Sequence, residues 1–243
     1  MLSKNELKYI QSLGHKKQRD EAQAFIAEGP KLAEEILNSD FEVLKIFATN
    51  KYLQKHESFS FPVTEVSEDE LQKLSNLSKA NQVLLLVKQK AADQSPNADG
   101  KMSIVLDAIQ DPGNMGTIIR IADWFGINQI VCTIDCVELY NPKVVQATMG
   151  SLCRVNVWYG NTSQWLSEAT VPVYGALLEG ENIYSSRKVE EGILVIGNEG
   201  KGISEELKSF ITHPVTIPRI GGAESLNAAV ATAIIVGCMK NNS

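Results

Sequence analysis

The 243-residue chain has the composition of an ordinary globular protein, with 44% apolar and 21% charged residues. No apolar run approaches the roughly 18 residues that span a bilayer, and the first residues hold no apolar signal core, so we expect neither a membrane protein nor a secreted one. The net charge of −6 argues against indiscriminate nucleic-acid binding, but a summed charge does not exclude a local basic face.

Cysteines and histidines, the usual ligands of transition metals, are few and scattered. The cysteines are Cys132, Cys136, Cys153 and Cys238. The histidines are His15, His56 and His213. Neither the cysteines nor the histidines have the spacing of metal ligands, and the cysteines do not have the spacing of paired disulfides. We therefore expect reduced thiols, no metal and a cytoplasmic location.

The first ninety residues predict a small α/β domain. Apolar runs expected as strands are residues 25–28, 43–48, 61–66 and 83–87. Helices are expected at residues 4–12, 30–37 and 50–56, and after Ser67. Two capping boxes, Ser3 with Glu6 and Ser67 with Glu70, mark helix starts. Strands that alternate with helices indicate the α/β class.

A change of composition at residues 91–101, which are rich in small and polar side chains, predicts a linker between domains at 1–90 and 102–243. In the second domain the expected strands are residues 102–109, 130–134, 154–158, 171–178, 193–196 and 215–217. The expected helices are residues 111–125, 142–149 and 225–240. The last helix is almost wholly apolar, which indicates burial in a core or in a subunit interface.

Two glycine-rich loops follow apolar strands in the last fifty residues. The first is residues 197–202 and the second contains Gly221 and Gly222. Glycine lets a backbone approach a ligand closely, and two such loops at neighbouring strand ends would form a crevice for a nucleotide-like ligand. Each loop alone is equally well explained as a tight turn between strand and helix.

Other common site chemistries are not supported. The loop from Gly197 has neither the spacing nor the hydroxyl of a Walker phosphate loop, and a Gly-x-Gly-x-x-Gly fingerprint after the first strand is absent. No Gly-x-Ser-x-Gly occurs, and the scattered histidines argue against a zinc or hydrolase site.

Three stretches of the second domain together resemble the signature motifs of the SpoU (TrmH-type) RNA ribose 2′-O-methyltransferases of the SPOUT class. They are residues 111–120 (DPGNMGTIIR), 196–202 (IGNEGKG) and 217–227, which begins Ile-Pro and ends Glu-Ser-Leu-Asn. They occur in the family's order and frame residues 102–243 almost end to end. The first ninety residues are similar, more loosely, to the substrate-binding domain of the members that modify ribosomal RNA.

The resemblance implies an α/β fold in which a small N-terminal RNA-binding domain precedes a trefoil-knotted methyltransferase domain. It also implies a homodimer formed through the C-terminal domain, and S-adenosylmethionine as the cofactor. By motif position, the catalytic residues would be Asn114, Arg120, Glu199, Ser225 and Asn227. The residues around the cofactor would be Leu177, Gly197, Gly202, Ile217 and Leu226.

The cationic cluster at Lys16, Lys17 and Arg19 precedes the first strand, and the resemblance places it in the RNA-binding domain. Such a cluster is either a solvated helix face or a set of contacts to RNA phosphates, which position an RNA without specifying its sequence.

The family resemblance makes Arg120 the candidate base for the ribose hydroxyl. The pKa of arginine lies above ~12 and full deprotonation is not expected in proteins. Two roles therefore stay open: Arg120 accepts the proton late in the transfer, or its positive charge lowers the pKa of the hydroxyl while phosphate or water takes the proton.

The sequence thus predicts an S-adenosylmethionine-dependent RNA 2′-O-methyltransferase that acts on ribosomal RNA, in the cytoplasm. Transfer RNA is the alternative substrate. A non-catalytic dimeric RNA-binding protein is the alternative from another class, and the presence of all five catalytic positions argues against it.

Overall fold

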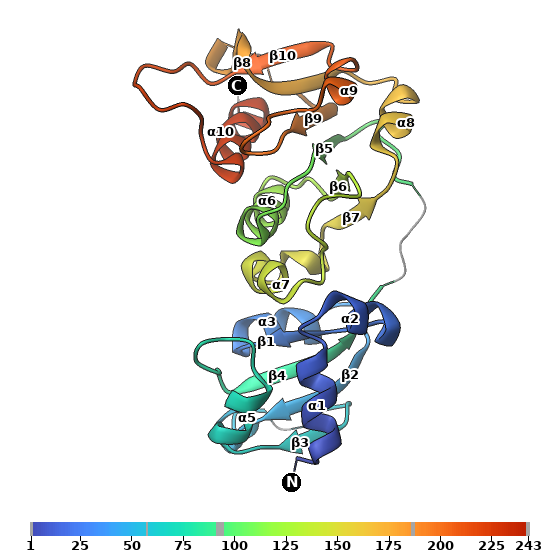
Figure 1. Ribbon diagram of the computed structural model, residues 1–243, viewed down its shortest axis with the longest axis vertical. Coiled ribbons are helices and arrows are strands. Elements are labelled where there is room, and N and C mark those ends of the chain that lie inside the picture. Colours follow the sequence, from blue (N-terminus) through green and yellow to red (C-terminus); the bar gives the residue numbers. More distant parts are fainter. Residues whose placement is uncertain (1, 57, 91–94, 186–187, 242–243) are drawn as a thin grey trace. The chain divides into compact units, whose positions relative to one another are not determined.

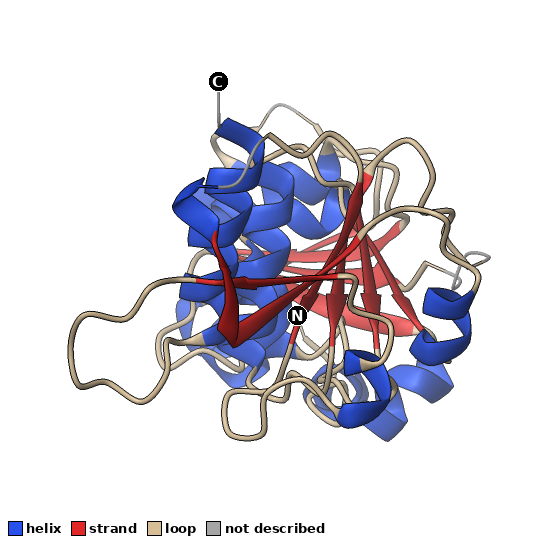
Figure 2. Ribbon diagram, turned by 90° about the horizontal axis from the view of Figure 1, so that it is seen from above, coloured by secondary structure: helices blue, strands red, loops and turns tan. Residues whose placement is uncertain are grey.

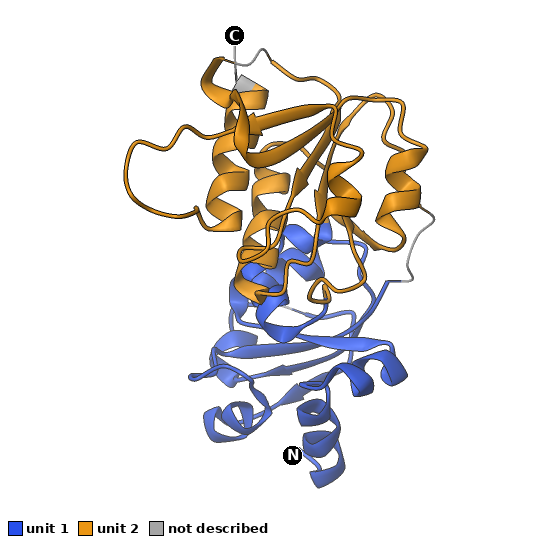
Figure 3. Cartoon of the chain, turned by 45° about the horizontal axis from the view of Figure 1, so that its top comes forward, with its two compact units in different colours: residues 1–91, 140–153 blue, residues 92–139, 154–243 orange. Residues whose placement is uncertain are grey.

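The computed structural model describes residues 2–56, 58–90, 95–185 and 188–241, in which helices and strands alternate along the chain (Figure 1, Figure 2). They form two compact units (Figure 3). Unit 1 comprises residues 1–91 and 140–153, and unit 2 comprises residues 92–139 and 154–243. Part of the predicted linker, residues 91–94, lies outside the described residues.

Unit 1 is built on a mixed four-stranded sheet in the order β1-β4-β2-β3. The strands are β1 (Ala24–Glu28), β2 (Val43–Ala48), β3 (Val63–Glu65) and β4 (Val83–Lys88). β4 runs antiparallel to both β1 and β2, and β2 runs parallel to β3. All four predicted strands are present, the third shorter than expected.

Five helices before the linker belong to unit 1: α1 (Lys4–Ser12), α2 (Lys16–Ala22), α3 (Pro30–Leu37), α4 (Asn50–Leu53) and α5 (Glu68–Leu74). Both predicted capping boxes are confirmed, because in each the serine side chain accepts from the third helical N–H and the glutamate accepts from the serine N–H. α4 is shorter than predicted. The N–H groups of Lys55 and His56 bond three residues back, which tightens the turn and ends the α-helix.

One face of the unit 1 sheet carries a continuous apolar core. Its buried residues come from α1, α5 and the inward positions of β1, β2 and β4: Ile10, Leu13, Ala24, Ile26, Phe47, Val66, Leu71, Leu74, Leu84 and Leu86. Burial of side chains from elements far apart in sequence is the main stabilising term for such a unit.

A short segment from the second half of the chain also belongs to unit 1. It contains α7 (Pro142–Thr148) and the 3₁₀ turn η1 (Ser151–Cys153). The ring of Tyr140 stacks on Phe25 with centroids 4.6 Å apart, and the Tyr140 hydroxyl accepts from the Lys90 N–H at 3.1 Å. The sequence predicted the helix but gave no sign of this packing, because an apolar stripe does not show what it packs against.

Unit 2 is built on a parallel six-stranded sheet in the order β10-β8-β9-β5-β6-β7. The strands are β5 (Met102–Leu106), β6 (Gln129–Cys132), β7 (Asn156–Tyr159), β8 (Val173–Asn182), β9 (Gly192–Ile196) and β10 (His213–Thr216). The predicted α/β class and the six predicted strands of the second domain are confirmed.

Helices cover both faces of this sheet, with α6 (Pro112–Trp124) and α10 (Ala228–Asn241) on one face and α8 (Thr162–Ser167) and α9 (Glu205–Lys208) on the other (Figure 1). The 3₁₀ turn η2 (Ile183–Ser185) follows β8. Strands covered on both sides are buried throughout, as in β5 and β9, which explains their continuous apolar sequences. No helix among the described residues is long and apolar enough to cross a membrane.

Glu28 is a buried carboxylate at the end of β1, with 6% of its surface exposed. Its two oxygens accept hydrogen bonds from the Ser75 hydroxyl and from the Asn76 N–H, at 3.0 Å for the latter. Glu28 therefore ties β1 to the loop between α5 and β4. Burial raises the pKa of the Glu28 carboxyl above its usual value of 4.5, although these hydrogen bonds lower it.

We predict that the stability of unit 1 depends on the protonation of Glu28. Because the folded-state pKa is raised, the contribution of this group is fully present below pH 4.5 and is lost as the pH rises through the folded-state pKa. Urea unfolding of the wild type and of Glu28→Gln at a series of pH values from 4.5 upward measures this. The free energy of unfolding of the wild type should fall relative to that of Glu28→Gln as the pH rises.

Glu6 provides a control of opposite sign. Hydrogen bonds from Lys45 and then Ser3 lower the pKa of Glu6 to about 2. The contribution of Glu6 is therefore present above pH 4.5 and is lost as the pH falls through about 2, so a Glu6→Gln variant should approach the wild type in acid. Parallel pH profiles for Glu28→Gln and the wild type would contradict the prediction for Glu28.

Candidate active site

The carboxyl edge of the parallel sheet carries the three motif loops. Residues 107–111 join β5 to α6, residues 197–204 join β9 to α9, and residues 217–227 join β10 to α10. β5 and β9 are direct neighbours and parallel, so their following loops begin side by side. The 217–227 loop extends far from the sheet and appears at the left of Figure 1 and Figure 2.

A chain of side-chain hydrogen bonds links the first turn of α6 to the loops after β9 and β10. The Asn227 amide donates through Nδ2 to Asn114 Oδ1 at 2.8 Å, and the Asn114 amide donates through Nδ2 to Glu199 Oε1. Three of the five predicted catalytic residues, which are up to 113 positions apart in sequence, are therefore in contact.

Both asparagines take part in helix caps, Asn114 through its backbone N–H and Asn227 through its side-chain oxygen. Asp111 is the N-cap of α6, and its Oδ1 accepts from the Asn114 N–H at 2.8 Å. Asn227 precedes α10, and its Oδ1 accepts from the N–H groups of Ala229 and Val230 at 3.0 and 3.2 Å. Because the Asn227 oxygen is engaged by the helix, its NH₂ group is the end that faces Asn114. The predicted start of the last helix at residue 225 is thus three residues early.

The other two predicted catalytic residues lie outside this chain of hydrogen bonds. Arg120 is six residues beyond Asn114 on α6, is exposed, and makes no hydrogen bond or ion pair within the described part of the chain. Ser225 is exposed in the 217–227 loop. The structure thus leaves the Arg120 guanidinium open to a ligand.

The predicted cofactor residues lie within or after three adjacent strands, β8, β9 and β10. Gly197 and Gly202 lie in the loop after β9, Ile217 follows β10, and Leu226 is 46% exposed near the end of the 217–227 loop. Leu177 lies in a stretch of β8 that β10 skips, since Pro214 pairs with Gly175 while the next residue pairs with Glu181. Part-exposed apolar side chains such as Leu177, Ile217 and Leu226 suit an adenosine-like ligand.

Gly197 is needed by the loop itself. A Cβ at this position would lie 2.2 Å from the carbonyl carbon of Gly202 and 2.3 Å from the N of Ile203. The loop closes there, with Asn198 N donating to Gly202 O at 3.0 Å and Gly202 N donating to Asn198 O at 2.8 Å. The interpretation of this loop as a tight turn is therefore correct for Gly197, whatever ligand it also contacts.

The predicted RNA-binding cluster divides into exposed and buried residues. Lys16 and Lys17 are exposed on α2, where they form i,i+4 ion pairs with Asp20 at 3.5 Å and Glu21 at 3.8 Å. Arg19 is only 1% exposed, and its Nη1 donates to the Leu13 carbonyl at 2.7 Å. Arg19 faces the interior because it lies on the inner side of α2, so it has no access to phosphate in this structure.

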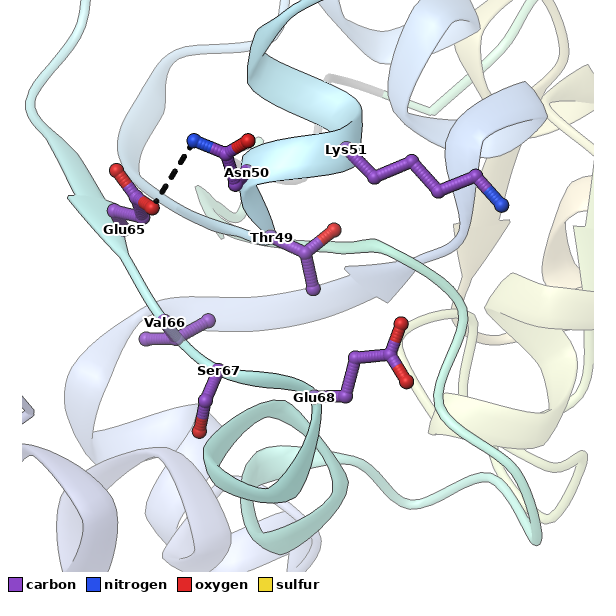
Figure 4. A pocket seen from close by; sticks show the side chains of 7 residues that line it. All are labelled: Thr49, Asn50, Lys51, Glu65, Val66, Ser67 and Glu68. Atoms are coloured by element: carbon purple, nitrogen blue, oxygen red, sulfur yellow. Dashed lines mark hydrogen bonds between the residues drawn. The ribbon is translucent and has the colours of Figure 1, made fainter.

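A hollow in unit 1, which the sequence did not single out, lies where β2 and β3 end and α4 and α5 begin. Its lining residues are Thr49, Asn50, Lys51, Glu65, Val66, Ser67 and Glu68 (Figure 4). The Asn50 amide points to Glu65 across it, with a hydrogen bond of 3.3 Å. One lysine against two glutamates does not select an anion. Among the described residues no group of histidine, cysteine, aspartate or glutamate side chains could hold a metal ion.

Both parts of the chain match known families. Residues 101–237 match the SpoU rRNA Methylase family, and residues 4–85 match the MRM3-like substrate binding domain. The chain is 30% identical over 240 residues, 96% of each chain, to the 23S rRNA (guanosine(2553)-2′-O)-methyltransferase RlmP of Bacillus subtilis.

Solved structures show the same fold over the whole length. A protein from Porphyromonas gingivalis, assigned to the TrmH family of RNA methyltransferases, is 36% identical with a TM-score of 0.90 and full coverage of both chains. An AdoMet-bound rRNA methyltransferase from Sinorhizobium meliloti is 29% identical with a TM-score of 0.87, covering 98% of this chain and 95% of the other.

The close approach at Gly197 predicts that Gly197→Ala destabilises unit 2. Backbone atoms cannot yield as a flexible side chain does, so the loss should be about 3 kcal/mol or more, measured by urea unfolding. Gly200→Ala is the matched control, because its Cβ would meet only Asn198 Oδ1 at 3.6 Å. Equal stability of the two variants would show that the loop is not closed as described.

Proposed function

The chain belongs to the SpoU rRNA methylase family, and we propose that it transfers a methyl group from S-adenosylmethionine to a ribose 2′-hydroxyl of ribosomal RNA. The observation that carries this proposal is the hydrogen-bond chain from Asn227 through Asn114 to Glu199, which links one residue from each of the three motifs. A full-length match to a relative named as a 23S rRNA 2′-O-methyltransferase supports the substrate.

Five residues at that edge would hold the cofactor: Leu177, Gly197, Gly202, Ile217 and Leu226. When bound, the cofactor supplies a methyl group already activated by its sulfonium, so the protein's task is to position the ribose hydroxyl and to manage its proton. The glycines of the loop after β9 let its backbone approach a ligand closely, while Leu177 and Leu226 offer part-exposed apolar surface.

Arg120 would act on the ribose hydroxyl. Its exposure and its lack of a partner within the described residues leave the guanidinium available to the substrate. A guanidinium beside the hydroxyl favours the alkoxide electrostatically, whether the proton then passes to Arg120 or to phosphate or water. Glu199, Asn114 and Asn227 would fix the loops around it, and Ser225 would join them from the 217–227 loop.

The charge distribution supports a division of labour between the two parts of the chain. In residues 1–91 lysine and arginine equal aspartate and glutamate in number, so the whole net charge of −6 arises after residue 91. An acidic catalytic part attracts phosphate poorly. RNA affinity would therefore depend on the N-terminal domain, residues 1–90, which matches a substrate-binding family over residues 4–85.

We further propose a cytoplasmic homodimer with a trefoil knot in the C-terminal domain, as the family resemblance implies. Trp124 at the end of α6 is 84% exposed and Val230 on α10 is 48% exposed, and these two helices pack together. A second copy covering them would remove apolar surface from water. Sedimentation of the full chain as a monomer would contradict the dimer.

The first prediction from this proposal concerns Arg120. Incubation with methyl-labelled S-adenosylmethionine should label protein-free ribosomal RNA at a 2′-oxygen, detected as an alkali-resistant dinucleotide. Arg120→Ala should lower kcat by about 10²- to 10⁴-fold, the usual range for losing an acid–base group. Arg120→Lys tests the electrostatic role, because it keeps the charge but loses the planar fork.

Arg154→Ala is the control and should leave the rate unchanged, since the Arg154 guanidinium is an exposed group already paired with Asp123 at 2.9 Å and lies in none of the three motifs. Label in transfer RNA alone would support the proposed reaction but contradict ribosomal RNA as the substrate. If neither RNA is labelled and the cofactor does not bind, the proposal that this chain is an enzyme is wrong.

A second prediction concerns Lys16 and Lys17. Replacing both with glutamine should weaken RNA binding without changing kcat, because their ammonium groups would contact phosphate. Each lost phosphate contact lowers the slope of log Kd against log salt by roughly 0.7 to 0.9. The matched control is Lys88→Gln, another exposed lysine in an ion pair, with Glu42 at 2.7 Å. If the slope of log Kd against log salt is unchanged, Lys16 and Lys17 do not contact phosphate and lie on a solvated face of α2.

A further inference from the structure

Asn198, between Gly197 and Glu199, uses both ends of its side-chain amide. Nδ2 donates to the carbonyl oxygen of Ala108 at 2.8 Å, two residues beyond the end of β5. Oδ1 accepts from the N–H groups of Gly200 and Lys201 at 2.9 and 3.1 Å. One side chain thus shapes its own loop and anchors that loop to the neighbouring strand.

The anchor at Ala108 has an uncommon backbone conformation. Ala108 has φ of 54°, in the left-handed region that residues with a Cβ rarely adopt. Its N–H donates to Thr133 Oγ1 at 2.9 Å, while its carbonyl receives Asn198. Strained conformations persist where the surroundings hold them, and they gather at functional sites.

The residue before Ala108, also in the loop after β5, holds the other end of the same loop. Asp107 is buried, and its Oδ2 accepts from the Ser204 N–H at 2.6 Å. Residues 107 and 108 therefore fix the loop on both sides of Glu199. The backbone of the segment that carries Glu199 is therefore held at both ends, and the Glu199 carboxylate accepts from Asn114.

We propose that Asn198 is a positioning residue for the methyl-transfer reaction: by joining the Glu199 loop to Ala108, it holds the Glu199 carboxylate against Asn114. The inference rests on the proposed function. Asn198 acts through Glu199 and does not itself meet the reacting atoms, which distinguishes it from the five catalytic residues.

A double-mutant cycle tests this dependence. Asn198→Ala and Glu199→Ala should each lower kcat at saturating RNA and cofactor, by up to about 100-fold for a misplaced group. If Asn198 acts only through Glu199, the double variant should be no slower than Glu199→Ala alone. Multiplying effects, or full activity of either single variant, would overturn the proposal.

A spectroscopic measurement decides the same question without turnover. The side-chain NH₂ resonances of Asn114 report its hydrogen bond to Glu199, and they should shift in Asn198→Ala to the positions seen in Glu199→Ala. Unchanged resonances would overturn the positioning role. A wild type that transfers no methyl group would instead overturn the proposed function, while these resonances still decide the role of Asn198.

Two further variants separate positioning from stability. Asn161→Ala removes a comparable amide, whose Oδ1 accepts from the Gln164 N–H at 3.0 Å at the start of α8, and it should lower Tm without lowering kcat. Asn198→Asp keeps the acceptor for Gly200 and Lys201 but sets a carboxylate oxygen against the Ala108 carbonyl. Its kcat should be as low as that of Asn198→Ala. A wild-type kcat would show that the hydrogen bond from Asn198 to the Ala108 carbonyl is not needed for the reaction.

Discussion

The two-sided amide of Asn114 is the interaction on which the site depends. A carboxylate can only accept, whereas an amide both donates and accepts, so the order from Asn227 through Asn114 to Glu199 has one consistent arrangement. An aspartate at position 114 would place carboxylate against carboxylate. Because the Asn114 backbone N–H is bound by the N-cap residue Asp111, the start of α6 holds the backbone from which this amide reaches the loops after β9 and β10.

The sheet order makes that contact possible. Parallel strands end at the same edge, and β9 lies between β8 and β5, so loops from distant parts of the chain begin close together. The same order places the bulged stretch of β8 that holds Leu177 next to the loop that starts at Gly197. A ligand at this edge would therefore meet apolar side chains and backbone groups at once, as sites at the ends of parallel strands commonly do.

Local signals predicted local structure well. Both capping boxes formed because the serine and the glutamate need only each other and the intervening turn. The motifs predicted which loops meet, and the contact of Asn227, Asn114 and Glu199 agrees with them. What failed depends on distant neighbours: the charge pattern could not show that Arg19 turns inward, and nothing near Asn198 indicated that its amide reaches Ala108, 90 positions away.

The 217–227 loop of the single chain exposes large apolar side chains. Ile220 is fully exposed and Leu226 is nearly half exposed, while burying such a side chain contributes roughly 1.5–3 kcal/mol. Fixing each loop residue costs about 1–2 kcal/mol, and within the loop Arg219 bonds only the Ala223 carbonyl among the contacts described. The anchor at Asn227 sets one end. A ligand or a second copy that covered the loop would bury these apolar side chains, and that burial would offset the cost of ordering Ser225 and Leu226.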